Sequence, residues 1–158
     1  MRSNVRRLER PSPPADSLRP LEQSLAINLL RAREAVMAHF RPQLLENDLS
    51  EQQWRVIRAL AEGGAIDAGT AAQRSCVHPA SFSRILRSLQ TRGLLAASPC
   101  AADSRRLLVE LTAAGRELFE HMAPASEAIY RRLEHKLGKD KIAEAVRMAQ
   151  AISIALRD

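Results

Sequence analysis

Residues 78–92, HPASFSRILRSLQTR, place short hydroxyl side chains and arginines on one side of a predicted helix and aliphatic side chains on the other. An ordinary solvent-facing helix surface carries long side chains that pair with one another. Here the small serines leave room for close approach, and Arg84, Arg87 and Arg92 supply guanidinium groups, which suit paired hydrogen bonds to phosphate and guanine. The pattern therefore indicates binding of a large polyanion.

The ends and the buried face of this helix can be assigned from residue types. His78 is at the cap position, Pro79 is at the first helical position, where a missing N–H costs nothing, and Gly93 ends the helix. The predicted buried face is Phe82, Ile85, Leu86 and Leu89. The residues predicted to contact DNA from the opposite face are Pro79, Ala80, Ser81, Ser83, Arg84 and Arg87.

The positive charge of the chain is concentrated around this helix. The net charge is +6, and residues 68–109 hold six arginines against Asp103 alone, which gives +5. Residues 1–20 hold five arginines against two acids, which gives +3, while residues 21–67 are net −2 and residues 110–158 balance. A basic middle segment is the footprint of a nucleic-acid-binding surface, and an inert solvated basic face is the alternative.

The remaining elements are predicted to be helical apart from one hairpin. A short helix, a tight turn and residues 79–92 form a helix-turn-helix, and the hairpin that follows it is a wing with a basic tip. The first two predicted helices are 21–45, kinked or ended near Pro42, and one that Ser50 and Gln53 cap and that stops at Gly63. The others are 68–75, capped by Asp67, 79–92, 112–137, capped by Thr112 and bent at Pro124, and one from Lys139. The predicted strands are 94–98 and 107–111, joined by the loop CAADSRR.

Composition narrows the class further. Only 3% of residues are aromatic while 46% are hydrophobic, so the core must be aliphatic, as in a mainly α fold. No apolar run is long enough to span a membrane, and two cysteines make no disulfide framework, which predicts a protein of the reducing cytoplasm. We find no pattern for metal, cofactor or catalysis, so we expect neither an enzyme nor a cofactor. The Arg/Pro/Ser-rich residues 1–20 are predicted to be a disordered basic tail.

From residue 22 to 156 the sequence resembles the MarR family of winged helix-turn-helix transcriptional regulators. The motifs that carry the resemblance are LSEQQWRVIRALAE (49–62), HPASFSRILRSLQTRGLL (78–95) and DSRRLLVELTAAGRELF (103–119). Within the family, LLRAREAVMAHFRPQLLEN (29–47) is most similar to the HpaR-like branch that controls aromatic-acid catabolism.

The resemblance implies an intertwined helical dimer that represses transcription. Its dimerisation helices would be residues 21–47 and 112–158, and its DNA-binding lobe residues 48–111. The family's wing tip matches Asp103 and Arg105, and Asp103 can fix the guanidinium of Arg105 or Arg106 for entry into a narrow minor groove. The sequence departs from the family at Cys100, where relatives commonly have an aspartate at the start of the wing.

A small aromatic-acid effector is the last implied partner. Arg33 lies within the apolar stripe of the first helix, where a guanidinium needs a partner. That partner is either a carboxylate across the dimer or the carboxylate of the effector. The other predicted effector-binding residues are Met37, His39, Trp54, His121 and Met122.

The favoured function is a homodimeric repressor that binds a pseudo-palindromic double-stranded DNA operator and is released by a phenolic or hydroxypyridine carboxylate. Two alternatives remain open: a redox-gated repressor of the same fold that uses Cys76 or Cys100, and a nonspecific architectural DNA-binding protein.

Overall fold

The computed structural model describes residues 19–156, so the predicted tail lies almost wholly outside the described residues. The chain divides into two compact units after Met37. The first holds a short 3-10 helix, Leu21–Gln23, and α1, Leu25–Met37. Among the described helices none combines the length and the apolarity needed to cross a membrane.

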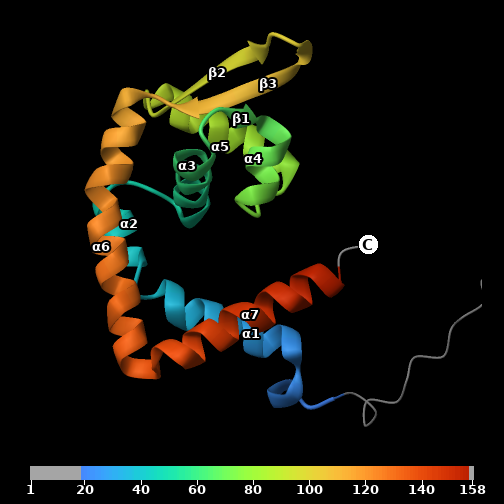
Figure 1. The fold of residues 1–158 in the computed structure, drawn as a ribbon, viewed down its shortest axis with the longest axis vertical. Helices are drawn as coiled ribbons and strands as arrows, with labels where there is room; N and C mark the ends of the chain where they lie inside the picture. Colours follow the sequence, from blue (N-terminus) through green and yellow to red (C-terminus); the bar gives the residue numbers. More distant parts are fainter. Residues whose placement is uncertain (1–18, 157–158) are drawn as a thin grey trace, which may run out of the picture. The chain divides into compact units, whose positions relative to one another are not determined.

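The second unit contains all the other elements (Figure 1). They are α2 (Arg41–Glu46), α3 (Glu51–Gly63), β1 (Ile66–Asp67), α4 (Ala68–Arg74), α5 (Pro79–Thr91), β2 (Leu95–Cys100), β3 (Asp103–Leu111), α6 (Ala113–Leu137) and α7 (Lys139–Ala155). Helices α3, α4 and α5 gather beneath the β2–β3 hairpin, and the long α6 leads away from it to α7. The predicted mainly α fold with a small β-wing is confirmed.

Local capping chemistry sets the helix starts as predicted. Ser50 and Gln53 form a reciprocal capping box at α3, Asp67 accepts the Thr70 N–H at α4, and Thr112 accepts the Gly115 N–H at α6. Each cap satisfies backbone donors that a first helical turn leaves unpaired. Gly115 also allows α6 to begin against the Leu94 carbonyl, because a Cβ at this position would clash with that oxygen.

The prediction of one helix over residues 21–45 was wrong. Helix α1 ends at Met37, and a new helix, α2, begins at Arg41 with Pro42 in its first turn. Proline has no N–H and its ring clashes with the preceding turn, so it fits a helix start far better than a helix interior. The break also buries Phe40, whose ring lies 5.2 Å from that of Tyr130 on α6.

The wing is longer than predicted. Strand β3 begins at Asp103, and only Ala101 and Ala102 separate it from β2, so Arg105 and Arg106 lie on a strand and not in a loop. Proline has no N–H to donate to a neighbouring strand, so it fits best in a strand at the edge of a sheet. Strand β2 is such an edge strand, and it therefore accommodates Pro99 while its pairing with β3 extends through the polar segment. The sequence analysis also missed β1, whose Ile66 pairs with Val109 and completes a three-stranded antiparallel sheet.

The core of the second unit lies where α3, α5 and the sheet meet. Val56 and Ile57 of α3, Leu89 of α5 and Val109 of β3 are fully buried. Because these side chains come from α3, from α5 and from the wing strand β3, packing fixes α5 and the wing to a common base.

Candidate nucleic-acid interface and effector residues

Helix α5 has two chemically distinct faces, as predicted. Phe82, Ile85, Leu86 and Leu89 are 0–7% exposed and pack inward. On the opposite face the predicted DNA-contacting residues are exposed, with Ser81 half-buried: Pro79, Ala80, Ser81, Ser83, Arg84 and Arg87. The exposed face is therefore free of core packing and open to a ligand as large as a duplex.

Some polar residues of the same segment serve the fold. The Nδ1 atom of His78 accepts the Ala80 N–H at 3.3 Å and so caps α5. Ser88 accepts a hydrogen bond from Gln53 of α3. Arg92 donates to the carbonyls of Asp48 and Asn47 at 2.7 and 3.1 Å, which ties the end of α5 to the chain that follows α2. Arg92 is therefore a structural clamp, and Arg84 and Arg87 are the guanidinium groups left on the exposed face.

The two wing arginines have different partners. The Nε atom of Arg105 lies 3.2 Å from Asp103, and the Arg105 side chain is 91% exposed. Arg106 turns the other way and pairs with Asp67 at 3.0 Å. Asp103 thus orients Arg105, whereas Arg106 joins the wing to the start of α4.

Asp67 was not predicted as part of this site beyond its capping role. Its pKa falls to about 2, first because the Thr70 hydroxyl and backbone N–H donate to it, and also because Arg106 lies close. The carboxylate is therefore charged at any physiological pH. The pKa of Asp67 is lowered from 3.8 in the folded protein. The stability that the ionised carboxylate adds to the fold is therefore complete above pH 3.8 and is lost as the pH falls toward 2. No local sequence signal could have paired residues 39 positions apart.

Cys100 is the last residue of β2, at the start of the wing turn. The backbone N–H groups of Ala102 and Asp103 donate to its sulfur and lower the pKa of the thiol, and Arg106 adds to the effect. A lowered pKa means that the folded protein holds the thiolate at a pH where an unfolded chain does not.

We therefore expect alkylation of Cys100 by iodoacetamide, measured in a Cys76→Ser variant, to reach half its maximal rate below pH 9.0, the ordinary value for the group. The same variant in denaturant is the control, since unfolding removes both hydrogen bonds. Coincident pH profiles for the folded and unfolded protein would contradict this account of the wing turn.

The predicted effector residues are divided between the two units. Arg33 and Met37 belong to α1, and His39, Trp54, His121 and Met122 belong to the second unit. Arg33 is 42% exposed, and its Nη1 atom lies 2.7 Å from Glu34. His39 and His121 are exposed, while Trp54 and Met122 are buried.

A polar contact between α2 and α6 adjoins the buried members of this set. Trp54 stacks on Phe119 of α6 with the ring centroids 5.9 Å apart. One turn further along α6, the Met122 carbonyl accepts a hydrogen bond from Gln43 at 2.6 Å, and the Ser126 hydroxyl donates to the same amide at 3.1 Å. Sequence reasoning missed Gln43, Phe119 and Ser126, because their meeting depends on how α2 and α3 pack on α6.

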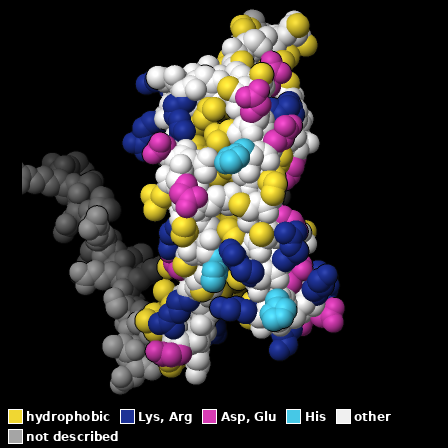
Figure 2. Space-filling model, turned by 90° about the vertical axis from the view of Figure 1, so that its left-hand side faces the viewer, with side chains coloured by type: hydrophobic (Ala, Val, Ile, Leu, Met, Phe, Trp, Pro, Cys, Tyr) yellow, Lys and Arg dark blue, Asp and Glu magenta, His cyan; other side chains and the backbone are white. Residues whose placement is uncertain are grey.

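A second basic surface lies on the C-terminal half of α6. Arg131, Arg132, His135 and Lys136 line a shallow depression of about 350 Å³. Figure 2, which looks onto the α6 side of the molecule, shows Lys and Arg side chains and histidines together toward the lower end of this face. Across residues 19–156 there is no group of three His, Cys, Asp or Glu side chains able to hold a metal.

The order of elements in the second unit defines the class of protein. A short helix, a turn, a helix with an exposed Ser/Arg face and an antiparallel hairpin make a winged helix-turn-helix. The comparisons with known proteins agree. Residues 47–106 match the model of the MarR family.

Three relatives are similar to this chain over most of its length. The homoprotocatechuate degradative operon repressor of Escherichia coli is 34% identical over 130 residues, which cover 82% of this chain and 88% of the relative. NadR in complex with 4-hydroxyphenylacetate is 33% identical, with a TM-score of 0.76 over 85% of this chain and 96% of NadR. BpsR of Bordetella bronchiseptica, whose DNA binding is regulated by 6-hydroxynicotinic acid, is 29% identical, with a TM-score of 0.73 over 81% and 97% of the two chains.

The chain belongs to the MarR family of transcriptional regulators, and its similarity to the homoprotocatechuate repressor and to NadR places it in the branch associated with aromatic acids. Curated relatives are named as a transcriptional regulator, FarR of Neisseria gonorrhoeae, and as an operon repressor, which points away from an enzyme.

Proposed function

We propose that this protein is a homodimeric repressor that binds a pseudo-palindromic operator and is released by a small aromatic or heteroaromatic acid. The observation that supports DNA binding is the exposed Ser/Arg face of α5, together with an exposed Arg105 on the wing that pairs with Asp103. A guanidinium already oriented before binding loses less side-chain entropy when it contacts DNA.

The expected docking follows from the positions of these side chains. Helix α5 enters a major groove, where Arg84 and Arg87 reach base edges or phosphates and Ser81 and Ser83 permit close approach. The wing lies over the neighbouring minor groove, whose electronegative floor attracts Arg105.

Dimer formation is supported by the apolar side chains that the single chain leaves uncovered. Neither α1 nor α7 has a buried residue, although Leu25, Leu30 and Val146 are apolar and 50–52% exposed. A second copy of the chain would cover such surfaces and would supply the two-fold symmetry that a palindromic site requires. We assign dimerisation to residues 21–47 and 112–158 and DNA binding to residues 48–111.

The relatives support the proposal that an aromatic acid is the effector. NadR binds 4-hydroxyphenylacetate and the DNA binding of BpsR responds to 6-hydroxynicotinic acid, so both ligands are carboxylates on an aromatic or heteroaromatic ring. We assign the effector's carboxylate to Arg33, and its ring to the side chains predicted with Arg33, which are Met37, His39, Trp54, His121 and Met122. To lower operator occupancy tenfold, the acid must bind the released state more tightly than the DNA-bound state by about 1.4 kcal/mol.

Replacement of Arg33 by alanine is expected to raise the acid concentration needed for half-release about tenfold, since a charge-assisted hydrogen bond contributes about 1.5–3 kcal/mol. Operator affinity without the acid should stay within about twofold of the parent. Fluorescence anisotropy of labelled operator, titrated with the acid, measures both quantities. Arg31→Ala, on the same helix, is the matched control, and equal responses of the two variants would remove Arg33 from the effector site.

The function as a whole can be tested by selecting bound sequences from a pool of random duplexes. The expected result is an inverted repeat with half-site centres about 10 bp apart, because two α5 helices of a dimer reach consecutive major grooves. Affinity that is independent of sequence would favour a nonspecific architectural protein. A thermal-shift screen of aromatic and pyridine acids, followed by release assays on the hits, would identify the effector.

A further inference from the structure

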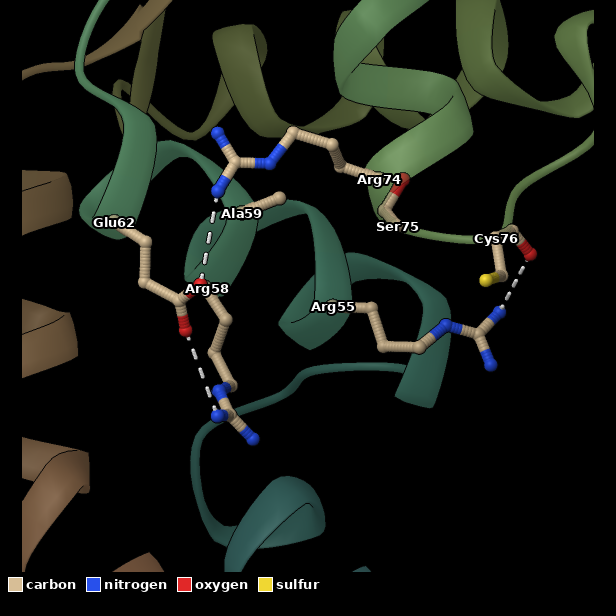
Figure 3. A pocket seen from close by; sticks show the side chains of 7 residues that line it. All are labelled: Arg55, Arg58, Ala59, Glu62, Arg74, Ser75 and Cys76. Carbon is tan, nitrogen blue, oxygen red and sulfur yellow. Dashed lines mark hydrogen bonds and ion pairs between the residues drawn. The ribbon is translucent and has the colours of Figure 1, made fainter. Parts of the chain in front are cut away.

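A small pocket lies between α3 and the turn that follows α4, outside every residue assigned above to DNA or effector. It has a volume of about 230 Å³ and is lined by Arg55, Arg58, Ala59, Glu62, Arg74, Ser75 and Cys76 (Figure 3). The turn leads directly into α5, so whatever binds in this pocket lies at the base of the recognition helix.

The pocket carries excess positive charge. Arg58 and Arg74 share a single carboxylate, with their Nη2 atoms 3.6 and 3.8 Å from the two oxygens of Glu62. Arg55 is the third guanidinium, so the residues that line the pocket hold three cations and one anion, an excess of two positive charges within this lining. Long, shared contacts of this kind leave guanidinium donors available to another anion.

Arg55 adds a donor that the fold does not use. Its Nη2 atom donates to the Cys76 carbonyl at 3.3 Å, which links α3 to the turn. Its Nε atom is buried and has no hydrogen-bond partner within residues 19–156. A buried donor without a partner is costly, so the fold leaves part of the hydrogen-bonding capacity of Arg55 unused.

Cys76 presents a free thiol at the rim of the same pocket. It is exposed, and its φ of 50° places a residue with a side chain in the left-handed region. Figure 3 shows its sulfur on the pocket side of the turn, toward the Arg55 side chain. Accessible thiols in electropositive surroundings are the ones that exchange with disulfides.

We propose that this pocket receives the carboxylates of a small anionic disulfide, of the class of glutathione disulfide, and that Cys76 forms a mixed disulfide there. The Cys76 thiolate attacks one sulfur of the disulfide, and the new S–S bond forms as the old one breaks. The departing thiolate takes up a proton equivalent to the one that Cys76 released, so no further oxidant is needed. The pocket thereby couples the state of the cellular thiol pool to the base of α5.

The mixed disulfide has an electrostatic consequence for DNA binding. A glutathionyl group carries two carboxylates and one ammonium, so it adds one net negative charge beside α5. DNA phosphates would be repelled, and the Arg55 contact to the turn would be disturbed. This consequence rests on the proposed DNA-binding function, whereas the exchange reaction does not.

The exchange is tested in a Cys100→Ser chain, in which Cys76 is the only thiol. Its rates are measured with glutathione disulfide and with uncharged 2-hydroxyethyl disulfide, and mass spectrometry of peptides locates the adduct. The ratio of the two rates should fall about tenfold in the double variant Arg58→Gln/Arg74→Gln, because electrostatic steering favours the anionic reagent alone.

The matched control is Arg116→Gln/Arg147→Gln, which removes the same charge from α6 and α7 and should keep the ratio. The uncharged reagent corrects for any change in folding, since a disturbed turn would alter both rates together. The proposal is overturned if Cys76 forms no adduct or if the pocket and control variants have the same ratio.

A measurement of operator binding distinguishes failure of this proposal from failure of the proposed function. The protein modified at Cys76 should bind the operator at least about tenfold more weakly, and dithiothreitol should restore binding. If the guanidinium groups instead hold DNA phosphates, unmodified Arg58→Gln/Arg74→Gln loses affinity while its rate ratio is unchanged. That result overturns the disulfide site without affecting the assignment of α5 as the DNA-binding helix.

Discussion

Replacement of Arg84 by alanine is expected to weaken operator binding by about 2–6 kcal/mol per dimer, since each lost base contact costs about 1–3 kcal/mol and the change occurs in both half-sites. Arg84 is exposed on α5, whose opposite face is packed into the core through Ile85 and Leu86. The substitution therefore removes a contact to DNA without opening a cavity. Fluorescence anisotropy with the selected operator measures the loss.

The same measurement on two further variants locates the interface. Arg105→Ala should also lose affinity, because its guanidinium is held by Asp103 at the wing and is 91% exposed. Arg116→Ala removes an equal charge from α6 and should bind the operator as the parent does. Unchanged affinity in both Arg84→Ala and Arg105→Ala would refute the proposed interface, whereas circular dichroism should find all three variants folded.

A glutamate at Val146 is expected to raise the dimer dissociation constant at least about 100-fold, which corresponds to about 2.8 kcal/mol. Val146 is 50% exposed in the single chain and lies mid-way along α7, in the apolar stripe with Ile142 and Ala149. If a partner covers this stripe, an ionised carboxylate there would be buried without a compensating charge. Sedimentation velocity should find monomer at concentrations where the parent is dimeric, and tight operator binding should be lost with it.

The control for this variant is Ala151→Glu. Ala151 is exposed and lies on the opposite side of α7, so it receives the same side chain outside the predicted interface. A dimer that persists in Val146→Glu would move the interface away from the stripe. Equal dissociation in both variants would instead indicate that α7 is surrounded on all sides.

The parts of this fold that depend on neighbouring residues were predictable. Capping at Ser50 and Thr112 involves a donor three residues away, and the buried face of α5 follows from apolar spacing within one helix. These interactions form within a turn or two, so residue types and periodicity suffice to identify them.

The features of the fold that could not be predicted depend on contacts between distant segments of the chain. Strand β1 is only two residues long and forms because Ile66 pairs with Val109 of the wing. The pairing of Arg106 with Asp67 and the bond from Gln43 to the Met122 carbonyl likewise join segments far apart in the chain. No local pattern encodes such partners, because the tertiary fold and not the neighbouring sequence brings them together.

The most direct measurement of the central claim is release of operator by an aromatic carboxylate and by its matched amide. Protein bound to labelled operator is titrated with 4-hydroxyphenylacetate and with 4-hydroxyphenylacetamide, and then with the corresponding pair of hydroxypyridine compounds. The account predicts release by at least one acid and none by its amide at the same concentration, because only the carboxylate can pair with a guanidinium. Operator binding that is indifferent to every acid, or release by acid and amide alike, would contradict it.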